Sequence, residues 1–373
     1  MITAVVMVGQ AEGDGEAASW VQGARRAATA DLLEMLAAQP LASRVILVSP
    51  ELDELAPRPM SDFVCSARGA LHVGEVLADL VEQHHISRLL YMGGGSAPLL
   101  ADADLQDVLK RVAEAEELVI TNNQFASDWL ALTPATALAK WVPRLPRDNM
   151  LGWVLSAEAG LPLQSPAPSA GSRLDIDTPM DLLALQLHWG VRPYLRRYLD
   201  TLALPVAHLQ AALEALARPA SHIFIAGRLA PDVWMALNRV TRSWLRVVSE
   251  ERGMVSSGRQ ARSEVRSLLA EHVEAVGMTS FFDVLAEWAE AAFIDTRVLL
   301  AHHGLWPDDA SRFASDLGRA AEVQDAWLRS FTEAALAAPI PVVLGGHGLM
   351  SGAMLAFCDI LRGDSTGRQA AGR

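Results

Sequence analysis

Residues 89–100 read LLYMGGGSAPLL, and this stretch decides the fold class that the sequence predicts. The run Arg88–Met92 is short and apolar and leads into three glycines, which is typical of a buried strand that ends in a tight loop. A helix is expected over Asp102–Ala115, because apolar residues recur there every three or four positions, and a strand is expected over Leu118–Thr121. Strand, loop, helix and strand in succession indicate a βα unit of a mostly parallel sheet.

The same alternation extends in both directions along the chain. Strands are predicted upstream over Ile2–Val8 and Arg44–Val48, and downstream over Ile223–Ala226, Trp244–Val248 and Ile340–Leu344. Apolar spacing from Phe281 to Leu299 favours one long helix, although Phe293–Leu300 alone is compatible with a strand. The predicted fold class is therefore α/β, with a three-layer, mostly parallel sheet in the N-terminal part and a second, helix-rich α/β domain after it.

The expected domain boundary lies near Arg218, where a helical stretch ends and a strand over His222–Ala226 begins. We expect a first α/β domain over residues 1–218, a second α/β domain over 219–362 and a disordered tail over 363–373. The proline-rich segment 161–172 is interpreted as a surface loop within the first domain.

The charge of the chain restricts its partners. With 31 Lys and Arg against 44 Asp and Glu, the formal net charge is −13. Affinity for nucleic acid comes largely from Lys and Arg that displace counterions, so DNA and RNA are not expected partners. No run reaches the roughly 20 apolar residues of a membrane span, and Ile2–Val8 lacks the basic flank of a signal peptide. We therefore expect a cytoplasmic protein that binds a small molecule, with homo-oligomerisation left open.

The segment LDIDTPMDL (residues 174–182) combines a helix start with two further acids. Asp175 and Asp177 point the same way in an extended segment, with Ile176 turned inward. Thr178 is a suitable N-cap, and Asp181 follows it three residues later at the favourable end of the helix dipole. Helix capping explains Thr178 and Asp181, whereas the other two carboxylates are candidate Mg²⁺ ligands.

Two segments together carry a resemblance to a known family. Ser96–Leu100, followed by Asp104-Leu105, resembles the G-D-x-P-L-L…D-L element of the GT-A-type nucleotidyltransferases. Asp148-Asn149 and then Asp175–Leu182 resemble the closing D-I-D-T-P-x-D-L element of the same group. The similarity is greatest to the branch of the molybdenum-cofactor and phospholactate guanylyltransferases, and it covers roughly residues 1–190.

The resemblance implies a GT-A, Rossmann-like fold and a Mg²⁺-dependent nucleotidyltransferase. Such an enzyme would act on a nucleoside triphosphate and a small phosphorylated or sugar-like acceptor. By the same resemblance Asp177 is the Mg²⁺ ligand and Asp175 the second catalytic carboxylate. The residues implied to contact the nucleotide are Gly9, Gly13, Gly93, Gly94, Gly95 and Ser96.

Two departures from the family pattern keep other functions open. Ser96 stands where the family has a metal-binding Asp, and a hydroxyl brings no charge to Mg²⁺. The loop after the first strand carries Glu12, Asp14 and Glu16 and lacks the family's Lys, which neutralises the triphosphate. One alternative is a catalytically inactive nucleotide- or metabolite-binding descendant. The other is a GT-A glycosyltransferase that uses a nucleotide sugar.

The second half contains a candidate anion site. The segment LGGHGLMSG (residues 344–352) follows a predicted strand, so Gly345, Gly346 and His347 form either a tight packing turn or a ligand loop. Arg228 and Arg252 each follow another predicted strand, and arginines at strand ends bind phosphate or carboxylate groups. If the strands are parallel, Arg228, Arg252 and His347 should approach one another; surface ion pairing of the arginines with Glu250 is the alternative.

The histidine pairs His84-His85 and His302-His303 are interpreted as structural. Adjacent residues on a helix point about 100° apart, so neither pair chelates one ion without ligands from elsewhere.

Overall fold

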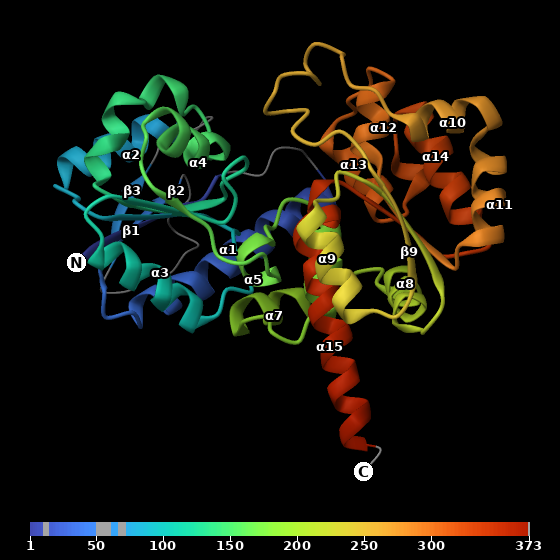
Figure 1. Ribbon diagram of the computed structural model, residues 1–373, viewed down its shortest axis with the longest axis horizontal. Coiled ribbons are helices and arrows are strands. Elements are labelled where there is room, and N and C mark those ends of the chain that lie inside the picture. Colours follow the sequence, from blue (N-terminus) through green and yellow to red (C-terminus); the bar gives the residue numbers. More distant parts are fainter. Residues whose placement is uncertain (10–14, 50–60, 66–71, 372–373) are drawn as a thin grey trace. The chain divides into compact units, whose positions relative to one another are not determined.

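The structure is a computed structural model that describes residues 1–9, 15–49, 61–65 and 72–371. The chain divides into two compact units, each with its own sheet and apolar core (Figure 1). The first unit comprises residues 1–11, 22–175 and 192–198, and the second comprises 12–21, 176–191 and 199–373.

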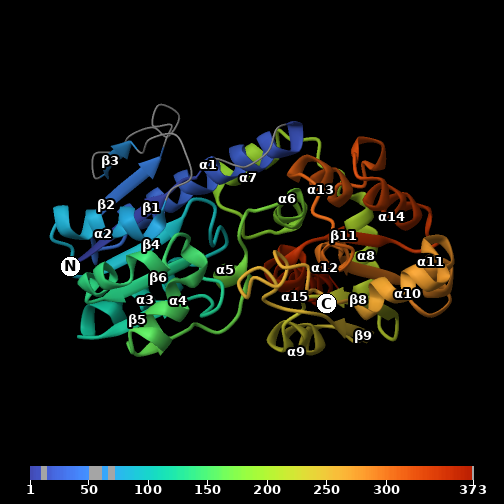
Figure 2. The same cartoon turned by 90° about the horizontal axis from the view of Figure 1, so that it is seen from above.

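The sheet of the first unit, here the N-terminal sheet, has the order β3-β2-β1-β4-β6-β5-β7, which Figure 2 shows from above. β1, β2, β3 and β4 are parallel, and β6 is antiparallel to both of its neighbours. Its strands are β1 (Ile2–Met7), β2 (Ala42–Ser49), β3 (Ser61–Cys65), β4 (Leu89–Gly93), β5 (Leu118–Thr121), β6 (Trp129–Thr133) and β7 (Leu163–Gln164). The predicted mostly parallel sheet is confirmed, whereas β6 and β7 are additions that the sequence pattern does not predict.

Helices cover both faces of the N-terminal sheet. Alternate residues of β1 point to opposite faces, and both faces are apolar. On one face α1 (Glu16–Ala37) and α3 (Asp102–Glu114) bury their apolar sides. On the other lie α2 (Val73–Gln83), α4 (Leu151–Trp153) and the π-helical turn η4 (Val154–Glu158). The three-layer α/β architecture is therefore confirmed.

The sheet of the second unit, here the C-terminal sheet, is entirely parallel in the order β11-β10-β8-β9. Its strands are β8 (His222–Gly227), β9 (Trp244–Ser249), β10 (Ala291–Asp295) and β11 (Val342–Gly345). The helices α10 (Leu268–Val276), α11 (Met278–Trp288) and α14 (Ala326–Ala337) form a core on one face. On the other face lie α8 (Ala207–Ala217) and α15 (Met354–Ala371), whose Phe357 contacts Phe293 of β10.

Each sheet has a point where the strand order reverses. In the first unit the chain runs outward from β1 through β2 and β3 and then returns to add β4 on the other side of β1. In the second unit β9 is added on one side of β8 and β10 on the other. Open α/β sheets bind ligands outside the carboxyl ends of the strands at such a reversal. The ends of β1 and β4, and those of β8 and β10, are therefore where a site is expected.

The long helix expected across residues 281–299 is wrong in its middle. α11 ends at Trp288, the strand β10 follows, and α12 (Thr296–His302) begins after it. β10 is buried along its whole length between two parallel neighbours, so it reads as a continuous apolar run without alternation. Apolar spacing does not distinguish such a strand from a buried helix.

Two further expectations differ from the structure. Residues 199–218, expected in the first domain, belong to the second unit because α8 packs on β8, β10 and β11. Residues 363–371, expected in a disordered tail, continue α15 as far as Ala371. Among the described residues no helix is long and apolar enough to cross a membrane.

Candidate functional site

The loop after β4 is tightly fitted to the end of β1. The Gly94 amide donates to the Met7 carbonyl (2.7 Å), and a Cβ on Gly94 would lie 2.8 Å from a methyl carbon of Val8. Gly95 has a φ of +106°, a conformation that favours glycine. A Cβ added to Gly9 would meet no described atom within 4 Å. Gly94 therefore packs closely against the end of β1, and Gly9 makes no such contact with the described residues.

The two segments that carry the family resemblance meet at this loop. Ser96 and Asp175 form an antiparallel bridge, and the Ala97 amide donates to the Leu174 carbonyl (3.0 Å). Asp175 is half-buried and Ile176 is fully buried, as expected for an alternating extended segment. Asp175 thus lies at the carboxyl edge of β4, while Asp177 belongs to the second unit.

Further polar side chains surround the same edge of the first unit. Tyr91 of β4 is buried and donates its hydroxyl hydrogen to Asp148 Oδ2 (2.9 Å). Burial and the nearby carboxylates of Asp148, Asp175 and Asp128 raise the pKa of Tyr91, so this hydroxyl stays protonated. The Asn122 amide donates to Asp128 Oδ2 (2.5 Å) at the end of β5. The sequence motifs assign no role to the side chains of Tyr91, Asn122 and Asp128. The pairing of β6 with β4 and β5 brings Asn122 and Asp128 to the end of β4 that carries the loop.

The donor set of the first unit fits Mg²⁺ only together with a ligand. Asp128, Asp148 and Asp175 all lie near Tyr91, but they are not among the described groups whose ligand atoms come within 4.8 Å of one another. Mg²⁺ commonly uses one or two carboxylates and takes its other ligands from substrate phosphates and water. The Ser96 hydroxyl is buried and donates to the Gly93 carbonyl (2.8 Å). Gly13 lies outside the described residues.

The C-terminal sheet carries a buried ion pair at its reversal point. Arg228 follows β8 and donates from Nε (2.6 Å) and Nη2 (3.1 Å) to the two carboxylate oxygens of Asp295, the last residue of β10. Burial opposes ionisation of Asp295, but the guanidinium of Arg228 keeps its pKa lowered overall. Arg228 is therefore paired with Asp295, and no ion pair with Glu250 is found among the described residues.

A second buried pair lies beside the first. Arg297 of α12 binds both oxygens of Asp316, the last residue of α13 (Asp309–Asp316), at 2.5 and 2.6 Å. Burial disfavours a charged Arg297, but the carboxylates of Asp316 and Asp295 raise its pKa. Arg297 also lies against Gly346, where a Cβ would come within 3.1 Å of its Nε. The tight turn Gly345-Gly346 is thus fitted around a buried guanidinium.

The start of α6 (Pro179–Leu187) adds a further buried carboxyl group, that of Asp181, to the second unit. Oδ2 of Asp181 accepts hydrogen bonds from the amides of Asp177 and Thr178 and from the Thr178 hydroxyl, at 2.8–3.1 Å. The expected cap at this helix start is therefore confirmed. Asp181 Oδ1 has no hydrogen-bond partner among the described residues and lies against Gly348, whose Cβ would be 2.6 Å away. Burial and the charge of Asp177 raise the pKa of Asp181 to about 7.

His347 and Arg252 lie near this buried network but outside it. Both side chains are exposed, and neither makes a hydrogen bond or an ion pair with any described residue. Desolvation and the guanidinium groups of Arg228 and Arg252 lower the pKa of His347. The expected approach of Arg228, Arg252 and His347 stays a prediction.

No family model and no curated protein matches the chain. Among solved structures, a candidate nucleotide-diphospho-sugar transferase from Desulfovibrio desulfuricans G20 is similar over 53% of this chain and 94% of that one, with 15% identity and a TM-score of 0.39. A cytidylyltransferase from Leptospira borgpetersenii serovar Hardjo-bovis (strain JB197) is similar over 53% and 91%, with 16% identity and a TM-score of 0.38. Similarity at this level carries no conclusion about activity.

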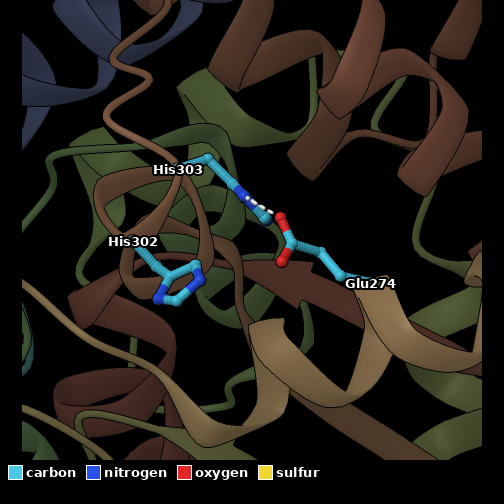
Figure 3. Close-up of side chains that lie close together, drawn as sticks. All are labelled: Glu274, His302 and His303. Atoms are coloured by element: carbon cyan, nitrogen blue, oxygen red, sulfur yellow. Dashed lines mark ion pairs between the residues drawn. The ribbon is translucent and has the colours of Figure 1, made fainter.

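His302, His303 and Glu274 also lie close together, with one ligand atom from each within 4.8 Å of the others (Figure 3). Desolvation lowers the pKa of His303, so a neutral ring donates from Nδ1 to Glu274 (3.0 Å). His302 Nδ1 accepts the Ser267 amide hydrogen (3.1 Å), which leaves the ring proton on Nε2. A metal-binding histidine uses its second nitrogen as a donor, so the His302 tautomer opposes a metal site. The structural role of this pair stays a prediction.

Substitution of Gly227 by alanine tests the close approach of β8 to β10. Gly227 has a φ of +139°, and a Cβ there would overlap the Asp295 Cβ. We expect Gly227→Ala to lower the free energy of unfolding by about 3 kcal/mol or more, because backbone strain and overlap add. The control is Gly304→Ala, with a φ of +66° and open space around it, which should cost only about 1–2 kcal/mol in urea denaturation. Equal losses would contradict the close-approach argument.

Proposed function

We propose that the first unit binds a nucleotide at the carboxyl ends of β1 and β4, and that the chain is a nucleotide-dependent transferase. The observation that supports this most is the bridge between Ser96 and Asp175, which joins the two resembling segments at the reversal point of the sheet. The substrate class is a nucleoside triphosphate or a nucleotide sugar with a small phosphorylated or sugar-like acceptor.

In this proposal each part of the edge has a separate task. Gly9 and the loop Gly93–Gly95 allow the nucleotide to approach the backbone closely. Asp175 would hold Mg²⁺, which would neutralise charge on the phosphate groups. Tyr91 keeps Asp148 in place by donating its hydroxyl hydrogen, so it is a positioning residue.

A second candidate function is a non-catalytic nucleotide- or metabolite-binding protein. The observation in its favour is Ser96, whose buried hydroxyl is used by the Gly93 carbonyl and brings no negative charge to a metal ion. A protein of this kind would bind nucleotide without dependence on Mg²⁺ and without turnover.

Thermal-shift titration with nucleoside triphosphates and nucleotide sugars, with and without Mg²⁺, distinguishes these functions. A ligand at 100 times its dissociation constant adds about 2.7 kcal/mol to the stability of the folded chain. We expect Asp175→Asn to remove most of the Mg²⁺-dependent part of this gain, and Ser96→Asp to increase it. Asp79→Asn, at an exposed position of α2, is the matched control.

Two outcomes would decide against the transferase. Nucleotide binding that is unaffected by Mg²⁺ and by Asp175→Asn favours the non-catalytic protein. Absence of any stabilisation by nucleotides at millimolar concentration would overturn both candidate functions.

A further inference from the structure

The carboxyl edge of the C-terminal sheet presents hydrogen-bond donors that no described residue uses. Arg252 follows β9 and His347 follows β11, and both are exposed without a hydrogen-bond partner among the described residues. Arg228 lies between them in strand order and binds Asp295 through Nε and Nη2 only. We call Arg228, Arg252 and His347 the arginine–histidine edge.

We propose that the arginine–histidine edge is a binding site for the oxyanion group, phosphate or carboxylate, of a small molecule. All of its residues belong to the second unit, so the inference does not depend on the nucleotide site proposed for the first. The site would give the second unit a ligand of its own.

The position of the arginine–histidine edge in the sheet favours a ligand-binding site over a group of surface charges without a function. Arg228 stands at the reversal of strand order between β8 and β10, where α/β sheets collect their ligands. Its orientation is fixed by a carboxylate that is itself fully buried, since the Asp295 side chain has no exposed surface. Taking such a pair out of water is costly and rarely serves stability alone, whereas a guanidinium held in one orientation suits recognition.

A second observation points to the loop that carries His347. Asp181 is 1% exposed, and its Oδ1 has no described hydrogen-bond donor although it lies against Gly348, the residue after His347. Buried polar atoms are almost always paired, and the exceptions gather at sites of function. On its other side the same loop contacts Arg297 through Gly346. The loop thus lies between the buried carboxyl group of Asp181 and the buried guanidinium of Arg297, and His347 is exposed.

The chemistry of the donors selects the ligand class. The planar guanidinium matches phosphate and carboxylate oxygens with two parallel hydrogen bonds, and the neutral His347 ring supplies one further donor. Asp177, which also influences His347 electrostatically, would accept hydrogen bonds from ligand hydroxyl groups. A polyanion is disfavoured by the net charge of −13, so a small molecule with one oxyanion group fits best.

Calorimetric titration of the full chain at low ionic strength with inorganic phosphate, pyrophosphate and succinate tests the proposal. We expect saturable binding of at least one of them at one site per chain. Arg252→Gln should weaken it about tenfold or more, which corresponds to losing a hydrogen bond to a charged group. His347→Gln should weaken it less, and Arg252→Lys should restore part of the loss, because charge returns without the planar fork.

Controls separate this site from the rest of the chain. Arg266→Gln, at an exposed position whose guanidinium contacts only backbone carbonyls, should leave binding unchanged. Tighter binding of phosphate or pyrophosphate identifies a phosphorylated ligand, and tighter binding of succinate a carboxylate ligand. No saturable binding below about 20 mM of any probe, or binding unaffected by Arg252→Gln and His347→Gln, would overturn the proposal.

Discussion

Replacing Arg297 by methionine is expected to lower the free energy of unfolding by about 3–5 kcal/mol. The substitution keeps most of the side-chain volume but leaves the Asp316 carboxylate, which has no exposed surface, without a counter-charge. A buried charge without a partner is far more costly than the pair, since the remaining ion keeps its desolvation penalty and loses its attraction. Urea denaturation followed by tryptophan fluorescence measures the loss.

A double-mutant cycle shows whether the pair itself stabilises the fold. We expect Arg297→Met combined with Asp316→Leu to recover most of the stability lost in the single variant, because two apolar side chains replace the pair without leaving an unpaired ion. Arg239→Met, at an exposed position of α9 (Pro231–Val240), controls for the change of side chain and should shift stability by less than about 0.5 kcal/mol. A single variant as stable as this control would contradict the buried-pair argument.

Strand and helix alternation makes most of the fold predictable. The predicted strands over Ile2–Val8, Arg88–Met92 and Leu118–Thr121 correspond to β1, β4 and β5, because each is a short apolar run bounded by polar or glycine residues. The pairing of β6 between β4 and β5 is not predictable, since the order of strands depends on contacts between segments far apart in the chain. The α/β class follows from local pattern, whereas the sheet order does not.

The candidate sites are predictable only in part. The sequence motifs single out Gly93–Ser96 and Asp175, and the structure brings Ser96 and Asp175 side by side. Asp295 and its pair with Arg228 escape prediction, because the apolar spacing across β10 favours a helix. One signal for this strand end is present in the sequence: Asp295 follows a fully apolar run and caps the helix that begins at Thr296.

Buried charge is the least predictable feature of the second unit. The sequence predicts a helix capped by Thr178 with Asp181 in its first turn, and Asp181 does lie in the first turn of α6, but its carboxyl group is 1% exposed. The spacing of residues along the sequence predicts the helix start but not the burial of the Asp181 carboxyl group, because that burial depends on contact with Gly348, which lies far along the chain. No sequence pattern singles out Asp316 and Arg297 as a buried pair, because their burial also depends on contacts between separate segments of the chain.

The second large effect concerns the pH dependence of stability. Burial and Asp177 raise the pKa of Asp181 from 3.8 to about 7, so the folded chain holds this proton more tightly than the unfolded chain does. The stabilisation from the protonated carboxyl is complete below about pH 4 and is lost as the pH rises through about 7. At about 1.4 kcal/mol for each pH unit between the two pKa values, the loss amounts to about 4 kcal/mol.

We therefore expect Asp181→Asn to become more favourable relative to the wild type as the pH rises. The asparagine oxygen replaces Oδ2 as acceptor for the Thr178 amide, while the titrating proton is removed. The difference in free energy of unfolding between variant and wild type should grow by about 4 kcal/mol from pH 4 to pH 8, measured by urea denaturation at each pH. Asp283→Asn, at an exposed position of α11, should show a difference that is flat with pH. A flat difference for Asp181→Asn as well would contradict the raised pKa of Asp181, because it would mean that this carboxyl group loses its proton as easily in the folded chain as in the unfolded chain.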